Sequence, residues 1–152
     1  MNQSAKGEGS NVRLLINRLR QNITLFKGLS FEDICFFLEY GEKVSFSQGD
    51  VMLQSKATGS HFFILLQGSV EVFVESSSAT VIRGSGNILG EIAALLNIKR
   101  TAQVKCQTDC VALRYHARIL EFVEGQRPKL ALKFYKNLVS AMVERYVIEE
   151  RR

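Results

Sequence analysis

Between residues 43 and 115 the chain is a series of short apolar runs separated by turn residues. In one run Val70, Val72 and Val74 occupy every second position, whereas residues 62–66 are apolar throughout. Successive side chains of a strand point to opposite faces, so the alternation predicts burial on one face and the unbroken run predicts burial on both. Many short antiparallel strands with helices at both ends predict a mainly β fold, a jelly-roll-like barrel flanked by helices.

The segment before the strands has the apolar spacing of helices. Apolar residues and arginines over residues 12–19 predict a short amphipathic helix. Ser30 has a side chain suited to a helix N-cap and Asp33 follows three residues later, so a second helix is predicted from there to about Tyr40. Its apolar face is predicted to be core and contains Phe31, Ile34, Cys35 and Leu38.

Helical spacing returns after the strands. It begins at His116, is interrupted over residues 125–128 and resumes at Pro128, which suits the first turn of a helix because that turn leaves its N–H groups unbonded. Nothing afterwards breaks this long C-terminal helix, and its apolar stripe is expected to pack on the strands. The stripe consists of Leu132, Tyr135, Val139, Met142 and Tyr146, widened by Phe134, Leu138 and Ala141.

Length and composition fit one domain, because 152 residues that are 46% hydrophobic can bury one core but hardly two. We expect a disordered tail over residues 1–11 and a single domain over residues 12–152. That domain comprises helices at 12–40, a β roll at 43–115 and helices at 116–152. No apolar run is long enough to span a bilayer and the polar N-terminus is unlike a signal peptide, so a cytoplasmic location is expected.

The formal net charge of +5 is spread along the chain rather than gathered in one patch. Diffuse charge argues poorly for a nucleic-acid groove. A helix-turn-helix module would need another pair of helices after the last one, where the sequence ends at Arg152. We therefore expect no nucleic-acid partner.

The cysteines and histidines do not follow a metal-binding or catalytic pattern. Cys35, Cys106 and Cys110 are odd in number and lack a C-x-x-C motif, so they are expected to be reduced core residues. A disulfide between Cys106 and Cys110, across a predicted turn, is the minor alternative. His61 and His116 have no Cys, Ser or carboxylate partner at motif spacing, so no catalytic or metal site is expected.

The residues from Gly90 to Ala102 bring backbone donors, a carboxylate and an arginine close together in the sequence. Gly90 tolerates backbone angles that other residues resist, and a helix beginning after it would direct unpaired N–H groups at an anion. Arg100 would bind the same anion with two donors of its planar guanidinium. Glu91 would repel the anion unless it faces away and accepts a hydrogen bond from a sugar hydroxyl.

This stretch resembles the phosphate-binding cassette of the cyclic-nucleotide-binding domain family, G-E-[LI]-A-L-[LI] followed after three or four residues by R-[AT]-A. Gly49, Asp50 and Val51, followed by the apolar strand beginning at His61, also match that family. The resemblance implies a β roll that binds cAMP or cGMP and needs no cofactor. The implied phosphate contacts are Gly90, the N–H groups of Ile92 and Ala93, and Arg100; Glu91 would bind the ribose 2′-hydroxyl, and Thr101 and Ala102 would form the opposite wall.

Two features depart from the family pattern. Lys99 stands where many members have proline or arginine, and residues 54–60 form a loop that is one residue longer than the usual Q-G-x-x-G-D and lacks its first glycine. Neither is expected to touch the anion contacts. Family members with threonine at position 101 can bond the amino group of a syn guanine, which favours tolerance of cGMP. cAMP is ranked slightly first because it is the commoner ligand of the family.

The resemblance implies a sensor or regulatory domain and not an enzyme, in which ligand binding closes the C-terminal helix and signals to a partner. It adds two roles for that helix: a lid over the purine, with Phe134, Tyr135 and Leu138 as candidates, and a seam for a homodimer. An unidentified effector protein is the other implied partner. The alternative is a scaffold or oligomerisation module that kept the roll and lost the ligand, for which the altered loop is support.

Overall fold

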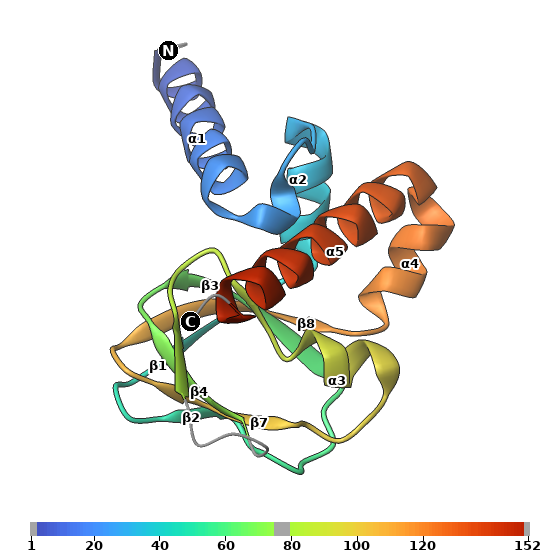
Figure 1. Ribbon diagram of the computed structural model, residues 1–152. Coiled ribbons are helices and arrows are strands. Elements are labelled where there is room, and N and C mark those ends of the chain that lie inside the picture. Colours follow the sequence, from blue (N-terminus) through green and yellow to red (C-terminus); the bar gives the residue numbers. More distant parts are fainter. Residues whose placement is uncertain (1–2, 75–79, 151–152) are drawn as a thin grey trace. The chain divides into compact units, whose positions relative to one another are not determined.

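The structure is a computed structural model that describes residues 3–74 and 80–150 of the chain. The chain forms two compact units. We call the first the helical unit, formed by Met1–Glu39 and Phe122–Arg152, and the second the roll unit, formed by Tyr40–Glu121. Figure 1 labels the elements of both units, which are described separately below.

The strands of the roll unit form two four-stranded antiparallel sheets. In the first sheet, in the order β1-β8-β3-β6, the strands are β1 (Glu42–Phe46), β8 (Cys110–His116), β3 (His61–Gln67) and β6 (Ile88–Leu89). In the second, in the order β2-β7-β4-β5, they are β2 (Val51–Leu53), β7 (Ala102–Cys106), β4 (Val70–Val74) and β5 (Thr80–Arg83). Figure 1 shows the strands wound around a common interior, and the sheets stay separate rather than closing into the predicted barrel.

Apolar side chains from both sheets fill the interior of the roll. The cluster contains Met52, Leu53, Phe63, Leu65, Val70, Leu89, Val104, Cys106, Cys110 and Ala112. The unbroken apolar run predicted a strand buried on both faces, and β3 confirms it, because residues 62–65 are all buried. In β4 Val70 is buried, while Val72 and Val74 are half-buried. The predicted hairpin tip at residues 76–78 lies outside the described residues.

The helical unit contains α1 (Gln3–Asn22), the short 3-10 helix η1 (Thr24–Phe26), α2 (Phe31–Glu39) and α5 (Pro128–Glu150). The helix α4 (Ile119–Gln126) begins in the roll unit and ends in the helical unit. The sequence predicted a disordered tail over residues 1–11, whereas α1 already begins at Gln3. Once a helix is nucleated, each added residue gains a hydrogen bond, so a polar segment without proline can extend it.

The N-cap of α2 and the first turn of α5 lie where the sequence predicted them. The N–H of Asp33 donates to the Ser30 hydroxyl at 3.0 Å, which confirms the N-cap. Pro128 is the first residue of α5. Of the predicted core face of α2, Ile34 is buried, and Phe37, which was not predicted, is buried as well.

Aromatic rings form the centre of the helical unit. The ring centroid of Phe37 lies 5.7 Å from that of Phe26 and 5.1 Å from that of Phe134. The side-chain amide of Asn137 donates to two main-chain carbonyls, those of Leu25 at 2.9 Å and Lys27 at 2.8 Å. The α5 helix is therefore bound to α2 by aromatic packing and to Leu25 and Lys27, in and just after η1, by hydrogen bonds.

Two faces of α5 are apolar, and only one is buried. The buried face consists of Leu130, Ala131, Phe134, Leu138 and Ala141. The exposed face consists of Leu132, Val139, Met142 and Val143. Much of the stripe that the sequence suggested for packing is therefore exposed, and the residues that widened it are the buried ones.

Candidate functional site

The turn that precedes the short helix α3 (Glu91–Leu96) begins the candidate site. Gly90 has a φ of 76°, in the left-handed region that favours glycine, and Asn97 with a φ of 53° ends the helix. A helix of six residues carries only a small dipole, so its N-terminus alone is a weak anion site. The binding chemistry therefore depends on the side chains around it.

Arg100 is a buried cation in the loop between α3 and β7. Its side chain is only 8% exposed, and burial lowers the pKa of its guanidinium from the ordinary value. Nη2 donates to the main-chain carbonyl of His61 at 2.8 Å, and Nη1 donates to that of Gly90 at 3.3 Å. The guanidinium is therefore held between β3 and the start of α3.

Both hydrogen bonds of the guanidinium go to neutral acceptors. Neither the salt bridge between Arg114 and Glu42 nor that between Arg127 and Asp33 involves Arg100. A charge removed from water without a counter-charge costs several kcal/mol unless something compensates for it. An anion at this position would supply that compensation.

Two glycines make room for the guanidinium. A methyl group on Gly59 would overlap the guanidinium of Arg100. One on Gly90 would lie 2.5 Å from Nη1 of Arg100 and 2.8 Å from Cδ1 of Leu53. Gly59 was not among the predicted site residues, because its contribution is the absence of a side chain. The signal available in the sequence was a glycine two residues before a buried strand.

The loop over residues 54–60 holds the backbone of Arg100. The N–H of Arg100 donates to the carbonyl of Ala57 at 3.0 Å, and the N–H of Lys56 donates back to the carbonyl of Arg100 at 2.9 Å. Thr58 and Lys99 form an isolated β-bridge beside them. Lys56 has a φ of 65°, in the region that favours glycine.

The expectation that this loop lies apart from the anion contacts was therefore wrong. The loop adjoins Arg100 through main-chain hydrogen bonds, which a comparison of side-chain types does not detect, whereas Lys99 is bridged to Thr58.

The other predicted site residues differ in burial. Glu91 is 3% exposed and Ala93 is buried, whereas Ile92 is 42% exposed. Thr101 is exposed, and Ala102 is half-buried at the start of β7. The structure brings Gly90 and Arg100 into direct contact and buries the carboxylate of Glu91 next to Gly90 in the chain.

The model of the cyclic nucleotide-binding domain family matches residues 43–123, which are 81 of the 152 residues. The chain belongs to the cyclic nucleotide-binding domain family. A cGMP-dependent protein kinase 2 from Mus musculus is 27% identical over 137 residues, which are 89% of this chain and 18% of the kinase. A cGMP-dependent protein kinase from Eimeria tenella is 36% identical over 111 residues, which are 66% of this chain and 11% of the kinase.

A solved structure supports the same assignment of the fold. The cyclic nucleotide-binding domain from Methylobacillus flagellatus aligns with a TM-score of 0.76 at 19% identity, over 85% of this chain and 75% of that one. The chain spans less than a fifth of the two kinases. The resemblance to them therefore concerns a small part of each kinase.

The three lid candidates lie in the helical unit. Phe134 is 1% exposed against Phe37, and Leu138 is on the buried face of α5. Tyr135 is half-buried, and its hydroxyl donates to the carboxylate of Glu124 at 2.6 Å. Each of the three side chains therefore packs or forms a hydrogen bond within the helical unit.

The described residues contain neither a cluster of metal ligands nor a candidate membrane span. No group of three or more His, Cys, Asp or Glu side chains there is placed to hold a metal. No described helix is long and apolar enough to cross a membrane. Cys106 and Cys110 are buried free thiols and Cys35 is a half-buried one.

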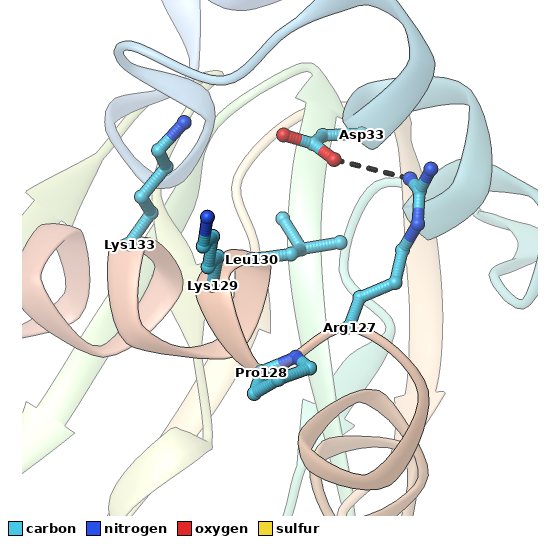
Figure 2. A pocket seen from close by; sticks show the side chains of 6 residues that line it. All are labelled: Asp33, Arg127, Pro128, Lys129, Leu130 and Lys133. Carbon is cyan, nitrogen blue, oxygen red and sulfur yellow. Dashed lines mark hydrogen bonds and ion pairs between the residues drawn. The ribbon is translucent and has the colours of Figure 1, made fainter.

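A hollow of about 430 Å³ lies at the start of α5 in the helical unit, and Figure 2 shows the side chains that line it. Arg127 reaches across it to the carboxylate of Asp33 at 3.0 Å, while Lys129 and Lys133 extend from α5. The arginine also lies over the ring of Phe36, 4.9 Å from its centroid. Because the best-placed cation is already paired, this hollow is a weaker anion site than Arg100.

Proposed function

We propose that this domain binds a cyclic nucleotide at Arg100 and acts as a regulatory sensor. The single observation that carries the proposal is a buried guanidinium whose hydrogen bonds go to two carbonyl oxygens. A monoanionic cyclic phosphate would provide the negative charge that the guanidinium lacks as a partner, and it would accept hydrogen bonds from two N–H groups of Arg100. The N–H groups of Ile92 and Ala93 and the small walls at Thr101 and Ala102 complete the proposed phosphate site.

Glu91 has a separate role in this proposal. Its carboxylate is buried, and an ionised carboxylate can only accept hydrogen bonds. The ribose 2′-hydroxyl is a donor of suitable chemistry. We expect both cAMP and cGMP to bind, since Thr101 offers an exposed hydroxyl that a guanine amino group could use. Two relatives are named for their dependence on cGMP, which favours including that nucleotide.

Exposed apolar surface supports a mechanism of transmission. In the roll unit Ile92, Leu96 and Ile98 are 42%, 65% and 43% exposed, on and just after the cassette helix. In the helical unit α5 exposes its second apolar face. Closure of α5 over the ligand would remove apolar surface from water at roughly 25 cal/mol per Å². The ligand drives this closure only if it binds the closed state better than the open one.

The exposed face of α5 also suits a second partner. Leu132 and Val139 are seven residues apart and Met142 follows three later, which is the spacing of a helix-pairing seam. We propose a second copy of this chain as the occupant when α5 is not closed over the ligand. An effector protein that binds the same face is the alternative.

The test is calorimetric titration of the purified domain with cAMP and with cGMP. In Arg100→Ala we expect affinity to fall by more than tenfold, because each charge-assisted hydrogen bond is worth about 1.5 to 3 kcal/mol. Lys99→Ala is the matched control, since it removes an exposed positive charge one residue away. Its affinity should change by less than about threefold. Equal affinities of Arg100→Ala and the parent would refute the role of Arg100.

A further inference from the structure

The two histidines of the chain face each other across neighbouring strands of the roll. His61 at the start of β3 is paired in register with His116 at the end of β8. Their ring centroids are 5.0 Å apart and the rings are inclined at 79°. The neighbouring His116 lowers the pKa of His61, because a second positive charge at this distance disfavours the protonated ring.

The first histidine is part of the support of the anion site. The main-chain carbonyl of His61 accepts the 2.8 Å hydrogen bond from Nη2 of Arg100. The ring of the same residue lies beside Ser60, with Nδ1 3.3 Å from its hydroxyl oxygen. The titrating ring and the anchor of the guanidinium thus belong to one residue.

The second histidine supports the start of α4. Nδ1 of His116 accepts a hydrogen bond from the N–H of Arg118 at 3.0 Å, one residue before α4 begins. In the neutral ring the proton is therefore on Nε2. α4 is also an element through which the chain passes between its two units.

Charged groups from several elements surround the pair. Burial is the first cause that lowers the pKa of His61, followed by His116, Arg114 and Arg100, while Glu42 on β1 opposes the shift. Glu42 is itself bound by Arg114 through a salt bridge of 2.5 Å. The surroundings therefore favour a neutral His61, and Arg100 contributes the smallest of the effects that lower its pKa.

We propose that His61, with His116 packed against its ring, links proton uptake to anion binding at Arg100, so that cyclic nucleotides bind more tightly at pH 5.5 than at pH 8. This inference rests on the proposed function. An anion at Arg100 cancels part of the positive potential that keeps His61 neutral, so the bound state holds more protons than the free state. By linkage, affinity must then rise as the pH falls.

The experiment is calorimetric titration of the parent with cAMP and cGMP at pH 5.5 and pH 8, each in two buffers of different ionisation enthalpy. The difference between buffers measures the protons taken up on binding. We expect uptake at pH 5.5, none at pH 8, and about threefold tighter binding at the lower pH, which corresponds to about half a pKa unit. Because it uses the parent protein, this measurement does not depend on any variant folding.

Variants assign the effect to the pair. His61→Gln keeps the main-chain carbonyl and removes the titrating ring, so its affinity should lose the pH dependence. His116→Asn removes the ring that packs on His61, but its side-chain oxygen can still accept the N–H of Arg118. His116→Ala removes both the ring and the acceptor, so a comparison of the two variants separates loss of the neighbouring ring from loss of the helix cap. We expect His116→Asn and His116→Ala to show the same reduced pH dependence, and only His116→Ala to lose stability.

The outcomes distinguish this inference from the proposed function. Binding with equal affinity at both pH values and no proton uptake overturns the inference and leaves the proposed function intact. Proton uptake that persists unchanged in His61→Gln overturns the assignment to this pair. Failure of both nucleotides to bind the parent at either pH overturns the proposed function, and the inference with it.

Discussion

At the scale of single residues, the position of Arg100 depends on what its neighbours lack. Gly59 and Gly90 flank the guanidinium, and a side chain on either would occupy its space. The pairing of Gly90 with Arg100 could be predicted, because the two are ten positions apart within one motif. The contributions of Gly59 and of the His61 carbonyl could not, since one is an empty volume and the other a main-chain atom.

Gly59→Ala is expected to weaken cyclic-nucleotide binding by about tenfold while the fold persists. The added methyl group overlaps the end of the flexible Arg100 side chain, so the guanidinium must shift rather than the backbone. Gly84→Ala is the matched control, because nothing lies within 4 Å of the added methyl group there. Calorimetric titration and thermal unfolding of both variants provide the check. If the Gly59→Ala protein binds cyclic nucleotides as tightly as Gly84→Ala does, the space beside Gly59 is not needed to position the Arg100 guanidinium.

Cys106 is expected to react slowly with thiol reagents. Burial, followed by the neighbouring Cys110, raises the pKa of its thiol from 9.0 to about 12. At pH 8 only about one thiol in 10⁴ would be ionised, and reactivity should increase as the pH rises toward 12. The folded state holds this proton more tightly than the unfolded chain, so its contribution to stability is complete below pH 9 and declines above it.

The measurement follows labelling of the native protein at pH 8 by mass spectrometry. Half-buried Cys35 should be labelled first, and Cys35→Ser should remove that fast phase. Urea should make all the cysteines reactive. Labelling of Cys106 as fast as that of Cys35 would show that its thiol is not protected.

At the scale of elements, features that depend on residues close together in the sequence were predicted well. Which of two apolar helix faces is buried was not. The Ser30 cap of α2 depends on residues three apart, so the sequence contained it. The buried face of α5 could not be predicted, because apolar residues lie on both of its faces. Phe37 was missed for a related reason, since its burial comes from the aromatic rings of η1 and α5.

Arg127→Ala is expected to destabilise the helical unit by about 1 to 2 kcal/mol. The change removes a partly exposed ion pair with Asp33 and a cation–π contact with Phe36. Lys129→Ala is the control, because this exposed side chain lines the same hollow and should change stability by less than about 0.5 kcal/mol. Urea unfolding monitored by circular dichroism measures both. Equal losses of stability in the two variants would mean that the contacts of Arg127 with Asp33 and Phe36 do not stabilise the unit.

At the scale of the whole molecule, the roll was predictable and the division into two units was not. Period-two alternation and turn residues are local, and they predicted a series of short strands between residues 43 and 115, where the structure has β1 to β8 from Glu42 to His116. The helical unit instead joins segments from opposite ends of the sequence. No local pattern encodes that pairing, which depends on complementary packing of α2, η1 and α5.

Thermal unfolding separates a ligand-binding sensor from a scaffold that has lost its ligand. A ligand present at 100 times its Kd stabilises the folded state by about 2.7 kcal/mol, which raises the Tm of a domain of this size by roughly 5 to 10 °C. We expect this rise with cAMP or cGMP in the parent and its loss in Arg100→Ala. An unchanged Tm with both nucleotides would favour the scaffold. Sedimentation of the same samples tests whether the ligand alters pairing through α5.

The two hydrogen bonds of Asn137 restrict how α5 can change position. Its one amide group spans the carbonyls of Leu25 and Lys27, so rotation of α5 about its own axis by a single residue, roughly 100°, would break both at once. A slide along the axis would do the same. The movements of α5 that keep both hydrogen bonds are those in which the segment around η1 moves together with the helix as one rigid body.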